Sequence, residues 1–443
     1  MKELPGYKGK ALEALRKSRA DIGDIIRIRQ RGKTYEGLLI PRSEFRDDQH
    51  VVIKLTNGYN VGVLVTPETK IEKTGKGTKP TFSTPALPRQ KPNLPKVGIL
   101  STGGTIASRV NYRTGAVRPA LTANDLYSVV PELSDIAAVE AEILFSILSE
   151  NITPEQWSQT VIHIANKIES GVQGVVVAHG TDTMGYTAAA LSFALQDLPV
   201  PVILVGSQRS ADRPSSDAAT NLIGAVKAAA DAPFAEVVVS MHETVSDKSI
   251  VFHRGTKVRK CHTSRRDAFK SVNASPLARL EHDRVTMLAK SFNKRSAERR
   301  LTIKPRFDEK VALFKFYPNA DAGVIDWLVD NGFKGIILEG TGLGHVGERC
   351  FSAVRKAIGE NLIIGMTSQC IWGRINMNVY DTGRDLLQIG VIPLGDMLPE
   401  TALVKMMWAL GQTKKAEEVK KLLTKNIAHE FSDRLVLETA GTR

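Results

Sequence analysis

Two short segments of the sequence place hydroxyl, carboxylate and glycine residues directly after a run of strand-forming residues. The first, residues 101–107 (STGGTIA), follows the apolar run 97–100, and the second, residues 179–183 (HGTDT), follows the apolar run 174–178. Glycine permits a sharp turn and a close approach to a ligand, so the polar side chains can face a crevice. Each loop alone has a plainer interpretation, because Thr and Asp after a strand commonly cap the next helix. Their occurrence as a pair favours a reactive site.

Threonine in such a loop points to acyl transfer through a hydroxyl nucleophile. A Thr hydroxyl is a poor nucleophile at its ordinary pKa, so it needs a base or a cation beside it. A lysine can serve as that base when burial or neighbouring charges lower its pKa. His179 is also at a strand end, but we expect it to be a hydrogen-bonded structural residue.

The strands and helices that hold these loops are predicted from Lys96 onward. Apolar strands and helical segments alternate there, which is typical of a parallel sheet covered by helices on both faces. Ligands bind such sheets at the carboxyl ends of the strands, where both loops lie. The predicted segments are strands at 97–100, 174–178 and 201–205, with helices at 157–168 and 186–195. A second α/β set begins with a strand at 311–316 and ends with an amphipathic helix at 401–410 and a charged helix at 414–425.

The first 95 residues have a different pattern. A short helix at 11–18 precedes four strands at 25–29, 35–40, 50–55 and 60–65, and Asn57-Gly58 marks a tight turn. Such short strands predict a small β-barrel of the SH3-like or Sm-like kind. Residues 75–95 contain five prolines and are predicted to form an extended linker. The expected division is a barrel at 1–74, the linker at 75–95, α/β domains at 96–290 and 311–443, and a connecting segment at 291–310.

Charge and composition narrow the class of protein. The 443 residues carry a net charge of +13, and residues 1–95 hold 19 Lys and Arg against 10 Asp and Glu, or +9. This basic first fifth indicates either an anionic partner such as nucleic acid or a solvated surface. No apolar run approaches the roughly 20 residues that span a bilayer, so no membrane segment is expected. Three scattered cysteines favour the reducing cytoplasm.

Two further motifs are discounted. Residues 342–347 (GLGHVG) match a dinucleotide-binding pattern, but the acidic residue expected about 20 positions later is absent. The nine histidines show no metal-binding spacing, so no metal site is expected.

The two loops resemble the paired signatures of the bacterial-type asparaginase/glutaminase family. The strings are TGGTIA at 102–107 and HGTDT at 179–183, with FKSVN at 269–273, and the resemblance covers residues 96–443. It implies an asparaginase-like core of two α/β domains and an acyl-enzyme mechanism with Thr105 as the nucleophile. Thr181 and Asp182 are implied as catalytic residues. Lys260 fits the family's catalytic lysine, with Lys257 as the competitor, and no cofactor is expected in this chain.

The same resemblance implies three substrate-binding residues. Tyr112 corresponds to a tyrosine of the flap that follows the first motif, and Ser149 to a serine that binds the substrate carboxylate. Glu150 occupies the next position, where the family usually has glutamine.

The added N-terminal region resembles a narrower family, the D subunits of archaeal glutamyl-tRNA(Gln) amidotransferases. The matching strings lie at 34–37 (TYEG) and 55–62 (LTNGYNVG), with further similarity at 207–210, 213–217 and 366–370. This resemblance implies a glutaminase that supplies ammonia to a partner, the amidotransferase E subunit, where ATP and Mg²⁺ are expected. It also implies a homodimer within a heterotetramer, and tRNA(Gln) bound through the complex. The alternatives are a free-standing L-asparaginase with an accessory domain and an RNA-binding protein built on an inactive asparaginase fold.

Overall fold

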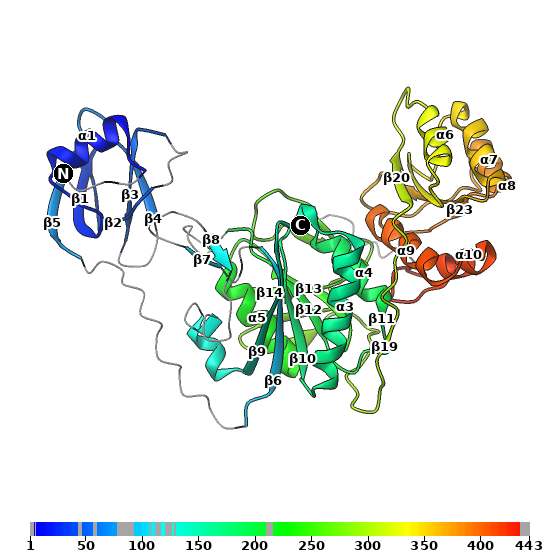
Figure 1. Cartoon of the computed structure of the whole chain (residues 1–443), viewed down its shortest axis with the longest axis horizontal. Coiled ribbons are helices and arrows are strands. Elements are labelled where there is room, and N and C mark those ends of the chain that lie inside the picture. Colours follow the sequence, from blue (N-terminus) through cyan, green and yellow to red (C-terminus); the bar gives the residue numbers. More distant parts are fainter. Residues whose placement is uncertain are drawn as a thin grey trace.

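The computed structural model describes residues 4, 6–42, 47–55, 60–77, 93–104, 106, 108–110, 117–119, 126–127, 130–209 and 216–434. Helix α1 (Gly9–Lys17) and one antiparallel sheet form the N-terminal domain. The sheet has the order β4-β3-β2-β1-β5 (Figure 1). Its strands are β1 (Asp24–Gln30), β2 (Lys33–Leu39), β3 (His50–Lys54), β4 (Asn60–Leu64) and β5 (Lys70–Lys76).

Alternation of apolar residues explains this small domain. Ile26 and Ile28 of β1 and Ile53 of β3 point inward and pack on Ala11 and Leu15 of α1. The prediction of four strands was wrong, because β5 pairs with β1 as a fifth strand. Among the seven residues of β5 the only large apolar one is Ile71, so its own sequence resembles the basic linker. The predicted start of the linker, at residue 75, falls inside this strand.

The first α/β domain contains an eight-stranded sheet with the order β18-β17-β14-β13-β12-β10-β6-β9. Successive residues of its central strands face opposite cores. Val175 and Val177 of β10 contact the core that includes α4, and Val176 contacts the core that includes α5. Burial on both faces is the reason that these strands are continuous apolar runs. The elements are β6 (Lys96–Gly103), β9 (Ala138–Ile147), α3 (Pro154–Glu169), β10 (Gly174–Ala178), α4 (Met184–Ala194), β12 (Val202–Val205), α5 (Ala218–Asp231), β13 (Val237–His242), β14 (Ser249–Arg254), β17 (Ala278–Glu281) and β18 (Arg284–Met287).

The prediction of a parallel sheet holds for only part of this domain. Strands β9, β6, β10, β12 and β13 are parallel, whereas β14, β17 and β18 add to the sheet in antiparallel fashion. Residues 243–248 join β13 to β14, and six residues are too few for a crossover helix. The chain must therefore reverse at that point, and the sheet becomes mixed.

The second α/β domain has a parallel four-stranded sheet with the order β20-β21-β22-β23. Its elements are β20 (Val311–Lys315), α6 (Gly323–Asp330), β21 (Gly335–Gly340), α7 (Phe351–Gly359), β22 (Ile363–Ser368), α8 (Asp381–Ile389), β23 (Ile392–Pro393), α9 (Pro399–Gln412) and α10 (Ala416–Thr424). Short pairs and turns complete the chain: β7 (Ser108–Val110) with β8 (Val117–Pro119), β11 (Leu195–Gln196) with β19 (Thr302–Ile303), β15 (Val258–Lys260) with β16 (Phe269–Ser271), and the 3₁₀ turns η1 (Pro131–Asp135), η2 (Ser149–Asn151) and η3 (Glu348–Cys350).

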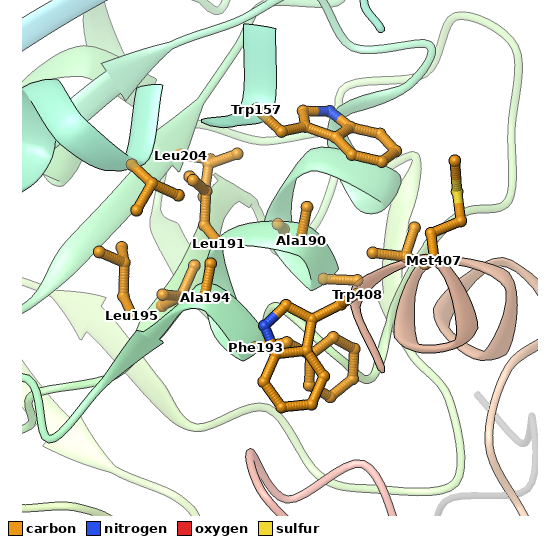
Figure 2. Packing of buried hydrophobic residues seen from close by; sticks show 14 of the residues in the cluster. Trp157, Ala190, Leu191, Phe193, Ala194, Leu195, Leu204, Met407 and Trp408 are labelled. Atoms are coloured by element: carbon orange, nitrogen blue, oxygen red, sulfur yellow. The ribbon is translucent and has the colours of Figure 1, made fainter. Parts of the chain in front are cut away.

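Helix α9 joins the two α/β domains. It was predicted to be amphipathic, which is wrong, since it is buried along nearly its whole length between α4 and the strands β20 to β22. Figure 2 shows Phe193 of α4 stacked on Trp408 of α9, with ring centroids 5.9 Å apart. The apparent polar face of α9 includes Lys405, which is fully buried and forms an ion pair with the equally buried Glu430. In the part of the chain that the structure describes, no helix is long and apolar enough to cross a membrane.

Candidate active site

The two motif loops leave neighbouring parallel strands and touch each other. Strands β6 and β10 are paired, and the Thr102 hydroxyl donates a hydrogen bond to the Ala178 carbonyl at 3.1 Å. Gly104 has a φ of +81°, and a Cβ atom on it would lie 2.8 Å from the backbone nitrogen of Gly180. Both the positive φ and the close approach require glycine at this position. The first motif is thereby packed directly against the second.

Thr105 and Tyr112 lie outside the described residues. Their assignment as nucleophile and flap tyrosine rests on the sequence and stays a prediction.

Lys260 brings the predicted catalytic residues of the second loop together. Its Nζ donates to Thr181 Oγ1 at 2.9 Å and to Asp182 Oδ1 at 2.8 Å. The Thr181 oxygen accepts this bond, so its own O–H can donate elsewhere. The Lys260 side chain is 15% exposed, whereas Asp182 is 70% exposed and faces solvent. The arrangement presents a threonine hydroxyl and a carboxylate on the two sides of one ammonium group.

The competing residue, Lys257, has a different environment. Its Nζ lies 2.7 Å from Asp396 Oδ2, and both side chains are 1% exposed. Burial lowers the pKa of Lys257, and the Asp396 carboxylate opposes that shift. The second Asp396 oxygen accepts a bond from the backbone N–H of Ser432. Lys257 therefore connects the two α/β domains, and Lys260 is the lysine that contacts Thr181.

Ser149 lies beneath the second loop, in η2. It is buried, and a Cβ atom on Gly180 would come within 2.8 Å of its Oγ. The Thr183 hydroxyl donates to the Ser149 carbonyl at 2.7 Å, which ties the loop to η2. We did not predict this role for Thr183, although it is the last residue of the HGTDT string. Glu150, the other predicted substrate-binding residue, is exposed.

His179 is a structural residue of the second loop, as expected. Its Nδ1–H donates to the Gly180 carbonyl at 2.6 Å, so its Nε2 accepts from the Thr187 hydroxyl at 2.9 Å. The indole N–H of Trp157 donates in turn to Thr187 at 3.0 Å. Burial lowers the pKa of His179 to about 4, which keeps the ring neutral.

This buried ring makes folding sensitive to acid. An unfolded chain protonates the ring near its ordinary pKa of 6.5, whereas the folded chain does so only near 4. Between these values the unfolded state binds more protons, so stability is lost as the pH falls from about 6.5 to about 4. We expect His179→Gln to reduce this loss by on the order of 3 kcal/mol. Urea unfolding at several pH values measures this loss of stability. If the free energy of unfolding changed with pH equally in the wild type and in His179→Gln, the assignment would be contradicted. Part of the pH dependence of stability should remain in the variant, because burial also lowers the pKa of His253 to about 3.

A third loop, at residues 206–209 after β12, supports Thr181 from behind. A Cβ atom on Gly206 would lie 2.7 Å from Thr181 Cγ2, so the two loops are in direct contact. The buried Asp217 carboxylate accepts the backbone N–H groups of Gln208 and Arg209 at 3.1 and 2.9 Å. We did not predict a role for Asp217, although it ends the similar string at 213–217. A buried carboxylate that caps a loop has no periodic signal in the sequence.

Models of known domain families match this chain in three segments. Residues 20–73 match the GatD N-terminal domain, residues 96–293 the N-terminal domain of asparaginase, and residues 310–423 the glutaminase/asparaginase C-terminal domain. The L-asparaginase of Thermococcus kodakarensis superimposes with a TM-score of 0.69 at 32% identity, covering 76% of this chain and 100% of its own. The L-asparaginase I of Vibrio cholerae gives a TM-score of 0.68 at 27% identity, covering 76% of this chain and 99% of its own.

Full-length relatives extend the match to the N-terminal domain. The glutamyl-tRNA(Gln) amidotransferase D subunit of Metallosphaera sedula is 50% identical over 438 residues, which is 98% of each chain. The corresponding D subunit of Pyrococcus abyssi is 49% identical over 426 residues, covering 95% of this chain and 97% of the relative. With an asparaginase-type core, an N-terminal β-domain and this identity over nearly the whole length, the chain belongs to the family of glutamyl-tRNA(Gln) amidotransferase D subunits.

Proposed function

We propose that this chain is the glutaminase subunit of a glutamyl-tRNA(Gln) amidotransferase. It hydrolyses the side-chain amide of glutamine and supplies the ammonia to a partner subunit, which converts Glu-tRNA(Gln) to Gln-tRNA(Gln). The observation that carries the chemistry is the contact of Lys260 with both Thr181 and Asp182 beside the first motif loop. The family relatives and the N-terminal domain support the amidotransferase context over a free asparaginase.

The reaction proceeds in two acyl-transfer steps. Thr105, which follows Gly104 in the sequence, attacks the amide carbon of glutamine and transfers its proton to the leaving nitrogen, so ammonia departs. Water then attacks the ester carbon, and the Thr105 oxygen leaves with a proton as glutamate forms. Thr181 and Lys260 move these protons, because the Thr181 hydroxyl accepts from Nζ and keeps its own O–H for the reacting atoms. Backbone N–H groups of the glycine-rich loops stabilise the oxyanion, each by about 3 kcal/mol.

Substrate binding uses the two ends of the amino acid. Asp182 and Glu150 are exposed carboxylates that suit the α-ammonium group of glutamine. Ser149 lies against Gly180 and suits the α-carboxylate. Tyr112, which the family resemblance assigns to a flap after the first motif, is proposed to contact the bound substrate.

The proposed assembly is a heterotetramer in which two copies of this chain combine with the amidotransferase E subunit, and it binds tRNA(Gln) through the complex. ATP and Mg²⁺ act on the partner, and no cofactor is needed here. Ammonia must be kept from bulk water, since its protonated form is not a nucleophile. A cytoplasmic location is proposed, since the substrate tRNA is there.

Ammonia release from glutamine and asparagine tests this function. The purified chain is assayed with and without its E-subunit partner and Glu-tRNA(Gln), and the Thr105→Ala variant serves as the inactive control. We expect low glutamine turnover by the chain alone and a rise when both additions are present. Fast asparagine hydrolysis that neither addition changes would instead identify a free-standing asparaginase. Activity that survives Thr105→Ala would overturn the nucleophile assignment.

A further inference from the structure

A row of polar side chains, most of them buried, extends from the loop behind Thr181 to the hairpin that carries Lys260. We call it the polar relay, and its members are Asp217, Asn221, His242, Asp247 and Arg266. Asp217, Asn221 and His242 are 0% exposed, and Arg266 is also buried. Buried polar groups are costly unless each hydrogen bond is satisfied, so an ordered row of this kind holds its ends in fixed positions.

The first end of the relay holds the loop at 206–209. The Asn221 side-chain nitrogen donates to the Gly206 carbonyl at 3.0 Å and to Asp217 Oδ2 at 2.9 Å. Asp217 in turn accepts the backbone N–H groups of that loop. Because Gly206 is in contact with Thr181, any displacement of this end changes the position of the Thr181 hydroxyl.

The second end of the relay reaches the β15–β16 hairpin. Asp247 lies in the turn between β13 and β14, and its Oδ1 accepts from Arg266 Nη1 at 2.7 Å. Arg266 belongs to the loop of the hairpin, whose strands pair Lys260 with Phe269. The relay therefore links the loop that supports Thr181 to the hairpin that positions Lys260.

Hydrogen bonds on both sides fix the orientation of the central ring. The Asn221 side-chain nitrogen donates to two oxygen atoms, the Gly206 carbonyl and Asp217 Oδ2, which fixes the orientation of the amide. The other amide atom, Oδ1, therefore lies 2.6 Å from His242 Nδ1. That oxygen can only accept, so Nδ1 must carry a proton. His242 Nε2 lies 2.9 Å from Asp247 Oδ1. The ring therefore connects the Asn221 side chain to the Asp247 carboxylate.

We propose that His242, which bridges Asn221 and Asp247, is a positioning residue that fixes Thr181 and Lys260 relative to each other. The inference rests on the proposed glutaminase function and adds a residue to it. The charged groups around the ring are Asp217 at the start of α5, Asp247 from the turn and Arg266 from the hairpin loop. Neighbouring Glu243 is bonded to Ser249 and Arg279 and stands outside the relay.

Variants of Asp247 test this role without removing a core residue, since its side chain is 61% exposed. Asp247→Ala removes the acceptor, and we expect kcat for glutamine in the complex to fall about tenfold or more with KM unchanged. Asp247→Asn keeps an oxygen acceptor for His242 and Arg266, and it should restore most of the kcat that the alanine variant loses. Glu243→Gln, in the same turn and paired to an arginine, is the matched control and should behave as the wild type.

Two outcomes would overturn the proposal. One is that Asp247→Ala keeps the wild-type kcat, whether or not its melting temperature falls. The other is spectroscopic: in ¹⁵N NMR of histidine-labelled protein, with His242→Gln identifying the signal, the His242 resonances should shift in Asp247→Ala but not in Glu243→Gln. Unchanged His242 resonances in Asp247→Ala would reject the proposal even if the wild-type complex released no ammonia. That second result would by itself refute only the proposed function.

Discussion

Replacing Lys260 with methionine is expected to lower kcat for glutamine hydrolysis on the order of a thousandfold. Its Nζ donates to Thr181 Oγ1 and Asp182 Oδ1, and no other contact of this ammonium group is seen among the described residues. Methionine keeps the length and apolar stem of the side chain but has no proton to transfer and no charge to orient Asp182. Ammonia release by the complex with Glu-tRNA(Gln) measures the effect.

The control for the Lys260→Met variant is a measurement of its unfolding, which shows whether lost activity comes from lost stability. The Asp182 carboxylate of the Lys260–Asp182 ion pair is exposed, so loss of the pair should leave the denaturation midpoint nearly unchanged. Lys260→Arg restores the positive charge, but a guanidinium group does not readily give up a proton. This variant should therefore recover little activity. A Lys260→Met protein that keeps more than about a tenth of the wild-type kcat would refute the catalytic assignment.

Replacing Lys257 with methionine should instead destabilise the fold, by roughly 3–5 kcal/mol. The Asp396 carboxylate, which is 1% exposed, would remain buried without its cation. It would keep the hydrogen bond from the Ser432 backbone N–H. Urea unfolding monitored by tryptophan fluorescence measures the loss. The folded fraction should keep a normal kcat, which separates this lysine from Lys260.

A double variant provides the control for that prediction. Asp396→Asn removes the charge while keeping an oxygen acceptor for the Ser432 N–H. Combined with Lys257→Met it should restore most of the lost stability, since removing both charges relieves the uncompensated one. Additive destabilisation by the two substitutions would show that the buried charge is not the cause.

The sequence predicted the parts of the fold that are encoded locally. Continuous apolar runs such as 174–178 identify strands buried on both faces, and the glycine-hydroxyl strings after them identify the loops of the site. The choice between Lys257 and Lys260 came from family resemblance, because both lie in one basic run. Their different partners, Asp396 and Thr181, are distant in sequence and become evident only in three dimensions.

The incorrect predictions have a common physical cause. Strand β5 forms because it pairs with β1, and the chain reverses at β14 because the connection before it is short. Helix α9 is buried because elements of two separate domains pack against it. In each case the deciding contact is with a partner that the local pattern does not contain. The polar relay is the same kind of feature, since its members come from α5, β13, the turn after β13 and the β15–β16 hairpin.

The burial of α9 also affects synthesis of the protein on the ribosome. Helix α4 is complete at Ala194, but the helix that covers its apolar face begins at Pro399, about 200 residues later. At about 5–20 residues per second, translation of that interval takes about 10 to 40 seconds. Throughout this time the face of α4 that packs on α9, including Phe193, lacks that covering helix, and exposed apolar surface of this kind is what chaperones bind. The first α/β domain therefore completes its packing only after α9 has been synthesised.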